Sequence, residues 1–133
     1  MRIVADTNLL IASIFWSGAP YKIVQHALDG KIEIITSNHI LNELRKVLQD
    51  PKEDFQLNEQ ETADIINGIL LYAKLISTDE QVNVVRDPKD NHVIACALSA
   101  NAEYIVTRDK DLLILKECGR IKILTPEEFL KLV

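Results

Sequence analysis

Four acidic residues stand where a metal-binding site would need them. Asp6, Asp90 and Asp109 each follow a short apolar segment, and these segments lie far apart in the chain. Glu43 instead lies within a segment of helical periodicity. Functional residues gather at the carboxyl ends of the strands in an open parallel sheet. We therefore expect the three aspartates to converge at one edge of a sheet, with Glu43 reaching them from a helix.

Convergent carboxylates repel one another unless a cation lies between them. At an effective dielectric constant of about 20, each close pair of carboxylates costs roughly 4 kcal/mol. A hard divalent ion relieves this repulsion, and oxygen ligands suit Mg²⁺ and Mn²⁺. The four acidic residues therefore predict a Mg²⁺ or Mn²⁺ site.

Each acidic residue also has a purely structural interpretation. An aspartate after a strand is often a helix N-cap, and Asp109 suits that role before a short helix predicted over 110–116. Glu43 could be a solvated position close to basic neighbours. Its spacing from Ile40 and Val47, however, places it at the border of the apolar stripe of its helix.

The third acidic position has two candidates. Asp87 precedes Pro88, which suits a helix cap, whereas Asp90 would lie in the first helical turn. We favour Asp90 as the ligand and keep Asp87 as the alternative.

Polar and basic residues beside these acids have both structural and functional interpretations. Thr7, Asn8 and Thr107 could cap helices and form turns, or they could hold the carboxylates in a ligating orientation. Ser37 and Asn91 are weaker candidates for that second role. Four cations next to the acids could contact phosphates or remain solvated: Arg86, Lys89, Arg108 and Lys110. Three histidines are expected at the surface or between helices: His26, His39 and His92.

Strand-like and helix-like segments alternate from one end of the chain to the other. Strands are predicted at 2–5, 32–36, 81–85, 104–107 and 120–124. Helices are predicted at 21–28, from Ser37 to the turn before Pro51, from Asn58 to Leu75, at 88–100, at 110–116 and after Thr125. This alternation is typical of an α/β protein, a three-layer α/β/α sandwich with a mainly parallel sheet of about five strands.

The composition indicates one soluble domain over residues 1–133. Hydrophobic residues make up 47% of the chain and charged residues 26%, as in ordinary folded proteins. No apolar run approaches the length of a membrane span, and Cys96 and Cys118 show no metal-ligand spacing. A reducing cytoplasm is the expected location. The four proposed ligands account for most of the net charge of −5, so a polyanionic substrate is compatible with the remaining surface.

The combination of motifs is more specific than its parts, and it resembles the PIN-domain family. Four segments carry the resemblance: Val4-Ala5-Asp6-Thr7-Asn8, the helix with Glu43, Arg86-Asp87-Pro88-Lys89-Asp90-Asn91, and Ile105-Val106-Thr107-Arg108-Asp109-Lys110-Asp111-Leu112. They span essentially the whole chain. The best match is the group of small prokaryotic PIN proteins assigned as toxins of toxin–antitoxin pairs, similar to VapC toxins.

This resemblance implies a PIN-like fold and a metal-dependent ribonuclease. Asp6, Glu43, Asp90 and Asp109 would surround Mg²⁺ or Mn²⁺, with Asp111 as an alternative fourth ligand. The ion would supply an activated water for in-line attack on an RNA phosphodiester, and Asp109 could orient that water. The implied partners are an RNA substrate and an antitoxin protein. The amphipathic segment 65–71 is consistent with a homodimer face or with the core.

Other interpretations compete with the nuclease. A receiver domain requires an acidic pair after the first strand and a lysine after the last, but Asp6 stands alone and Thr125-Pro126 follows the last strand. A haloacid-dehalogenase-like phosphatase requires an aspartate at the position of Asn8. The stronger alternative is a catalytically weak PIN-like protein-interaction module.

Overall fold

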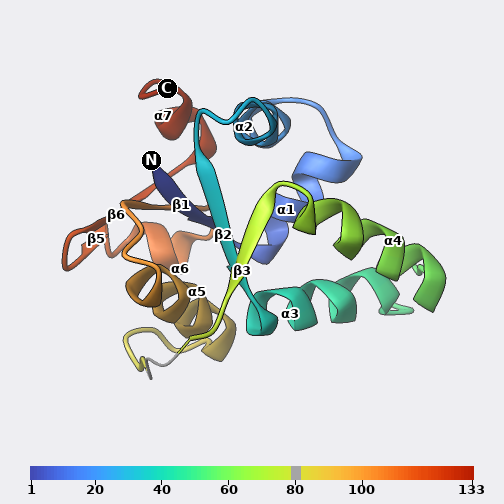
Figure 1. Cartoon of the computed structure of the whole chain (residues 1–133). Coiled ribbons are helices and arrows are strands. Elements are labelled where there is room, and N and C mark those ends of the chain that lie inside the picture. Colours follow the sequence, from blue (N-terminus) through green and yellow to red (C-terminus); the bar gives the residue numbers. More distant parts are fainter. Residues whose placement is uncertain (79–81) are drawn as a thin grey trace.

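The computed structural model describes residues 1–78 and 82–133 and is organised around one mainly parallel sheet (Figure 1). The strands of this part of the chain are β1 (Arg2–Ala5), β2 (Glu33–Ser37), β3 (Ala73–Ile76), β4 (Tyr104–Val106), β5 (Glu117–Cys118) and β6 (Ile121–Leu124). The helices are α1 (Thr7–Phe15), α2 (Ala19–Leu28), α3 (Asn38–Gln49), α4 (Glu59–Leu70), α5 (Pro88–Ser99), α6 (Lys110–Leu113) and α7 (Pro126–Leu130).

The strand order creates a switch point beside β1. The order is β3-β2-β1-β4-β6-β5, and only β5 pairs in the antiparallel sense among the described strands. The chain moves outward from β1 to β3 and then continues with β4 on the opposite side of β1. Val4 lies opposite Ile35 of β2 and Ile105 of β4. Ligands of open α/β sheets bind outside the carboxyl ends of the strands at such a point.

Helices cover both faces of the central strands. Ile3, Val4 and Ala5 are consecutive and all buried, although successive strand residues point to opposite faces of the sheet. Burial on both faces is typical of a parallel sheet between two helical layers. Helix α5 packs along β1, β2 and β4, so its first turn lies near the carboxyl ends of the strands. The predicted α/β class with a mainly parallel sheet is therefore confirmed.

The local helix signals predicted from the sequence are confirmed. The Ser37 side chain accepts a hydrogen bond from the Ile40 N–H and caps α3. Asn58 with Glu61, and Thr125 with Glu128, form complete capping boxes at α4 and α7. These caps use contacts within one turn, which explains why the sequence alone reveals them.

Two predicted elements were wrong. The helix expected to reach Leu75 ends at Leu70, and Ala73–Ile76 pairs with β2 as an edge strand. The strand expected at 81–85 is not formed by residues 82–85, and Gln81 lies outside the described residues. The Asn91 side chain holds this loop instead: its Oδ1 accepts the N–H groups of Val84 and Val85 at 2.9 and 3.0 Å. A short apolar run does not by itself distinguish strand from helix or loop.

Two elements were not predicted. Helix α1 is apolar along most of its length and shows no polar stripe, so its periodicity gave no signal. Strand β5 is a two-residue partner of β6, which brings the described strands to six instead of about five. Helix α6 ends at Leu113, before the predicted boundary of 116. No helix in residues 1–78 or 82–133 combines the length and apolarity needed to cross a bilayer.

Candidate metal centre

Asp6 is locked in place at the carboxyl end of β1. Its side chain is buried, and Oδ1 accepts the N–H of Leu9 at 2.9 Å, which caps α1. The hydroxyl of Thr107, at the end of β4, donates to Asp6 Oδ2. The same Thr107 oxygen accepts the N–H of Asp109 at 2.9 Å. Thr107 therefore connects the two acidic loops across the switch point, in the orienting role that the sequence allowed.

Asp90 lines this site and carries a buried carboxylate oxygen, Oδ2, that has no hydrogen-bond partner among the described residues. Asp90 lies in the first turn of α5 and is only 3% exposed. Buried polar atoms are nearly always hydrogen-bonded, so an orphaned carboxylate oxygen requires an explanation. A bound cation is a natural one.

Two further carboxylates approach Asp90. Asp90, Asp109 and Asp111 each offer an oxygen that lies within 4.8 Å of the others, and no other such group of acids, histidines or cysteines occurs in the described residues. Asp109 Oδ1 accepts the N–H of Asp111 at 2.8 Å, so Asp109 also caps α6. The cap role of Asp109 is therefore confirmed, and its carboxylate also lies within the close acidic group.

The electrostatics of the site disfavour its charged, metal-free form. Burial raises the pKa of Asp90 to about 6, and the negative charges of Asp109, Asp87 and Asp6 add to the effect, whereas Lys89 opposes it. Burial also raises the pKa of Asp6; hydrogen bonds from Thr107 and Leu9 oppose that shift, and the charge of Asp109 adds to it. A divalent cation would offset both the cost of burying the charged carboxylates and the repulsion between them. The oxygen donors therefore fit Mg²⁺ or Mn²⁺.

The hollow between these acids has room for about one water molecule or one small ion. Asp6, Asp90 and Asp109 line it together with Thr7, Asn8, Lys89 and Val93, and its volume is about 10 Å³. A volume of this order holds about one water or one ion. The hollow is therefore too small for an organic cofactor.

Glu43 and Asp87 lie beside this group and not within it. Glu43 is half-buried on α3 and lines an adjacent cleft with Thr7 and Lys89. Asp87 caps α5 by accepting the N–H of Lys89 at 3.1 Å, and its carboxylate lies 3.9 Å from the Lys89 ammonium. The structure therefore places Asp6, Asp90 and Asp109 around one hollow, with Asp111 close to Asp90 and Asp109. Glu43 lies on the wall of the neighbouring cleft.

Several other predicted residues have clear structural roles. Ser37 caps α3, and Asn91 holds the loop before α5. Asn8 is exposed at the rim of the acidic hollow. Arg108 forms an ion pair with Glu127 at 2.7 Å. The sequence did not reveal that His39 and His92, 53 positions apart, stack on each other, because only helix packing brings them together.

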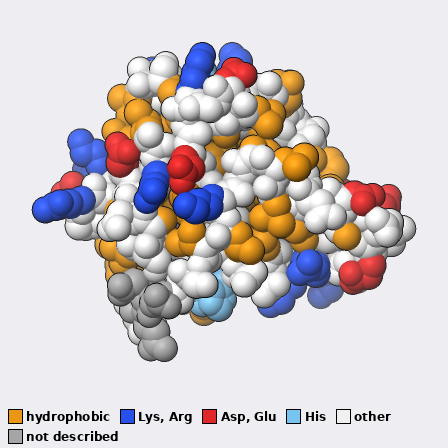
Figure 2. All heavy atoms as spheres, viewed as in Figure 1, with side chains coloured by type: hydrophobic (Ala, Val, Ile, Leu, Met, Phe, Trp, Pro, Cys, Tyr) orange, Lys and Arg blue, Asp and Glu red, His pale blue; other side chains and the backbone are white. Residues whose placement is uncertain are grey.

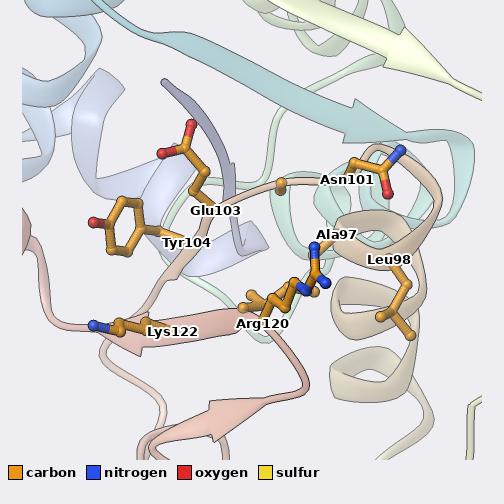
Figure 3. Close-up of a pocket in the computed structure, with 9 residues that line it drawn as sticks. Ala97, Leu98, Asn101, Glu103, Tyr104, Arg120 and Lys122 are labelled. Carbon is orange, nitrogen blue, oxygen red and sulfur yellow. The ribbon is translucent and has the colours of Figure 1, made fainter.

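A larger hollow lies at the other end of the strands, near the starts of β4 and β6 (Figure 3). Its volume is about 600 Å³, and Glu103 is the one acid among its lining residues. Figure 3 shows the Glu103 carboxylate and the Lys122 ammonium pointing in different directions. This hollow therefore lacks the converging carboxylates that lie at the switch point.

Comparison with known proteins gives consistent results. The profile of the family described as "PIN domain" matches residues 2–111. An uncharacterized protein of Methanocaldococcus jannaschii is 30% identical over 98% of this chain and 90% of its own length. The fold is also similar to a chain of VapBC2 from Rickettsia felis, solved bound to a DNA fragment from their promoter. The two structures superpose with a TM-score of 0.67 and are 16% identical in sequence. The superposition covers 92% of this chain and 97% of the other. FitAcB from Neisseria gonorrhoeae gives a TM-score of 0.57 at 14% identity, covering 94% and 98%.

Proposed function

Because this chain belongs to the PIN-domain family, we propose that it is a Mg²⁺- or Mn²⁺-dependent endoribonuclease. Two features of Asp90 carry the proposal: it has a buried carboxylate oxygen without a hydrogen-bond partner, and its carboxylate lies close to those of Asp109 and Asp111. Burial and mutual repulsion disfavour the ionised form of these carboxylates. A bound divalent cation would offset both effects, so the group favours cation binding.

The proposed ligands are Asp6, Asp90 and Asp109. Asp111 and Glu43 are the candidates for a fourth carboxylate. Asp111 already belongs to the close group, whereas Glu43 lines the cleft through which a substrate would approach. Thr107 positions the site, since it donates to Asp6 and accepts from the Asp109 N–H. Partners that orient ligands in this way contribute roughly 10- to 100-fold to metal affinity or activity.

The reaction is hydrolysis of an RNA phosphodiester by in-line attack of water. A bound divalent ion supplies an activated water and offsets charge that develops on the phosphoryl oxygens. Asp109 uses one oxygen to cap α6, and we assign its other oxygen to orienting the attacking water and accepting its proton. Lys89 lines both the acidic hollow and the adjacent cleft, so its ammonium is placed to meet a substrate phosphate.

Titration calorimetry with Mn²⁺ tests the proposal directly. The wild-type protein is expected to bind Mn²⁺ and to cleave single-stranded RNA only when a divalent ion is present. A double variant, Asp6→Asn with Asp90→Asn, is expected to lose both properties because it lacks two ligand charges. Circular dichroism of the double variant checks that its fold is retained. If the wild-type protein neither binds metal nor cleaves RNA, the chain is better described as an interaction module.

We further propose that the protein is the toxin of a toxin–antitoxin pair and acts in the cytoplasm. The support is the resemblance of its motifs to VapC-like PIN proteins, together with the shared fold. The proposed antitoxin contact and homodimer face use exposed apolar residues. Trp16 and Leu71 are 58% and 85% exposed, while Ile66 and Ile69 of the predicted face are buried in the core.

Expression of the toxin in a bacterial host is expected to slow growth, because ribonuclease activity depletes cellular RNA. The Asp6→Ala variant should grow at the rate of an empty-vector culture. Immunoblots of both proteins confirm equal expression. Growth arrest that persists in the Asp6→Ala variant would show that the effect does not come from the metal centre.

A further inference from the structure

Two histidines from different helices stack on each other beside the metal centre. His39 is in the first turn of α3, and His92 is in the second turn of α5. Their ring centroids are 3.9 Å apart, and the ring planes differ by 4°. His39 is exposed, whereas His92 is half-buried. Each ring in a two-ring stack keeps one face uncovered by the other, so the exposed His39 offers a flat aromatic surface backed by a second ring.

The pair lines the cleft that adjoins the acidic hollow. This cleft has a volume of about 450 Å³, within the range of small-molecule sites. Thr7 and Lys89 line both the cleft and the acidic hollow, so the two spaces share a wall. A substrate held at the carboxylates would therefore extend naturally toward the histidine pair.

The cleft carries charges of both signs, because Lys46 and Lys89 line it together with Glu43 and Asp87, and the Lys89 ammonium lies 3.9 Å from the Asp87 carboxylate. Lys46 of α3 is exposed and lines the cleft, and it forms no ion pair among the residues described. Figure 2 shows histidine side chains at the surface near the start of α3, with Lys and Arg side chains farther along the same helix. Cations that follow an aromatic platform are the combination that single-stranded nucleic acid binding uses.

We propose that this cleft holds the nucleoside next to the scissile phosphate, with its base stacked on the outer face of His39 and its phosphate near Lys46. The inference rests on the proposed ribonuclease function, and it identifies where the substrate is gripped outside the metal centre. Every base has an aromatic face, so the site tolerates sequence and selects for an unpaired strand. The half-buried His92 has a positioning role, because its ring holds the His39 ring flat.

Proton NMR tests the stacking without any cleavage. Metal-free protein at pH 8 is titrated with adenosine 5′-monophosphate, with uridine 5′-monophosphate and with ribose 5-phosphate. The two nucleotides are expected to move the His39 ring protons upfield in a saturable manner, because a stacked base shields them. Ribose 5-phosphate should leave these protons in place. His26, on α2, serves as the internal control and should not move.

Variants measure how much the platform contributes to RNA binding. Truncation of a stacking aromatic costs about 1–3 kcal/mol per base, so His39→Ala should weaken binding of a fluorescent single-stranded RNA by roughly 5- to 150-fold. His39→Phe keeps an aromatic face and should restore most of the affinity. His26→Ala is the matched control and should bind like the wild type. Mn²⁺ affinity should be the same in all four proteins.

The outcomes separate this inference from the proposed function. Nucleotide-dependent shifts at His39 without metal-dependent cleavage would support the stacking site and contradict the ribonuclease. Mn²⁺-dependent cleavage with unmoved His39 protons, or with unchanged RNA affinity in His39→Ala, would overturn the stacking site alone. Equal shifts with ribose 5-phosphate would also overturn it, because the contact would then be to phosphate.

Discussion

Replacing Asp90 by asparagine is expected to stabilise the metal-free protein while abolishing metal binding. Asparagine keeps the shape of the side chain and removes a buried charge that faces Asp109 and Asp111. The pKa of Asp90 is raised from about 4 to about 6, and each pKa unit corresponds to about 1.4 kcal/mol. At pH 8 without divalent ions, we therefore expect the free energy of unfolding to rise by about 1–3 kcal/mol, as measured by urea denaturation.

The same substitution should lower Mn²⁺ affinity and RNA cleavage by at least about 100-fold, because residues that merely orient ligands already contribute about 10- to 100-fold. Asp87→Asn is the matched control. Asparagine is an equally good N-cap, and Asp87 lies outside the close carboxylate group, so metal binding and cleavage should persist. Loss of activity in Asp87→Asn with full activity in Asp90→Asn would reverse our assignment between these two aspartates.

The stability of the metal-free protein should fall as the pH rises from about 4 to about 6. Burial and the neighbouring carboxylates raise the pKa of Asp90 above its value in the unfolded chain. In this window the folded state keeps its proton while the unfolded state has lost it. Stability decreases with pH wherever the unfolded state binds fewer protons. The full loss attributable to Asp90 is about 3 kcal/mol, reached above pH 6, and the raised pKa of Asp6 acts in the same direction.

Urea denaturation at several pH values, in the presence of a chelator, measures this dependence. Asp90→Asn removes the titrating group, and the difference between the two proteins cancels contributions from exposed carboxylates. Glu128, whose pKa is lowered by hydrogen bonds from Thr125, is one such contribution. Saturating Mn²⁺ should reverse the dependence of the wild type, because the metal binds the ionised carboxylates. A difference between the proteins that does not change with pH would contradict a raised pKa for Asp90.

The elements predicted correctly share one property: their signals are local. Caps such as Ser37 and the Asn58–Glu61 box act within a single helical turn. The strands that precede Asp6 and Asp109 are short apolar segments bounded by polar residues. Helix α1 and edge strand β3 lacked such signals, since one is apolar all round and the other acquires its conformation by pairing with β2.

The sequence by itself determined the family, the α/β class and the aspartates that could bind metal. Those conclusions depend on residue types and on spacing along the chain. Only the tertiary structure decided which side chains meet. It set Asp90 beside Asp109, left Glu43 in the adjacent cleft, and stacked His39 on His92. The physical reason is that these contacts join residues from separate helices and loops, and their distances follow from how the helices pack on the sheet.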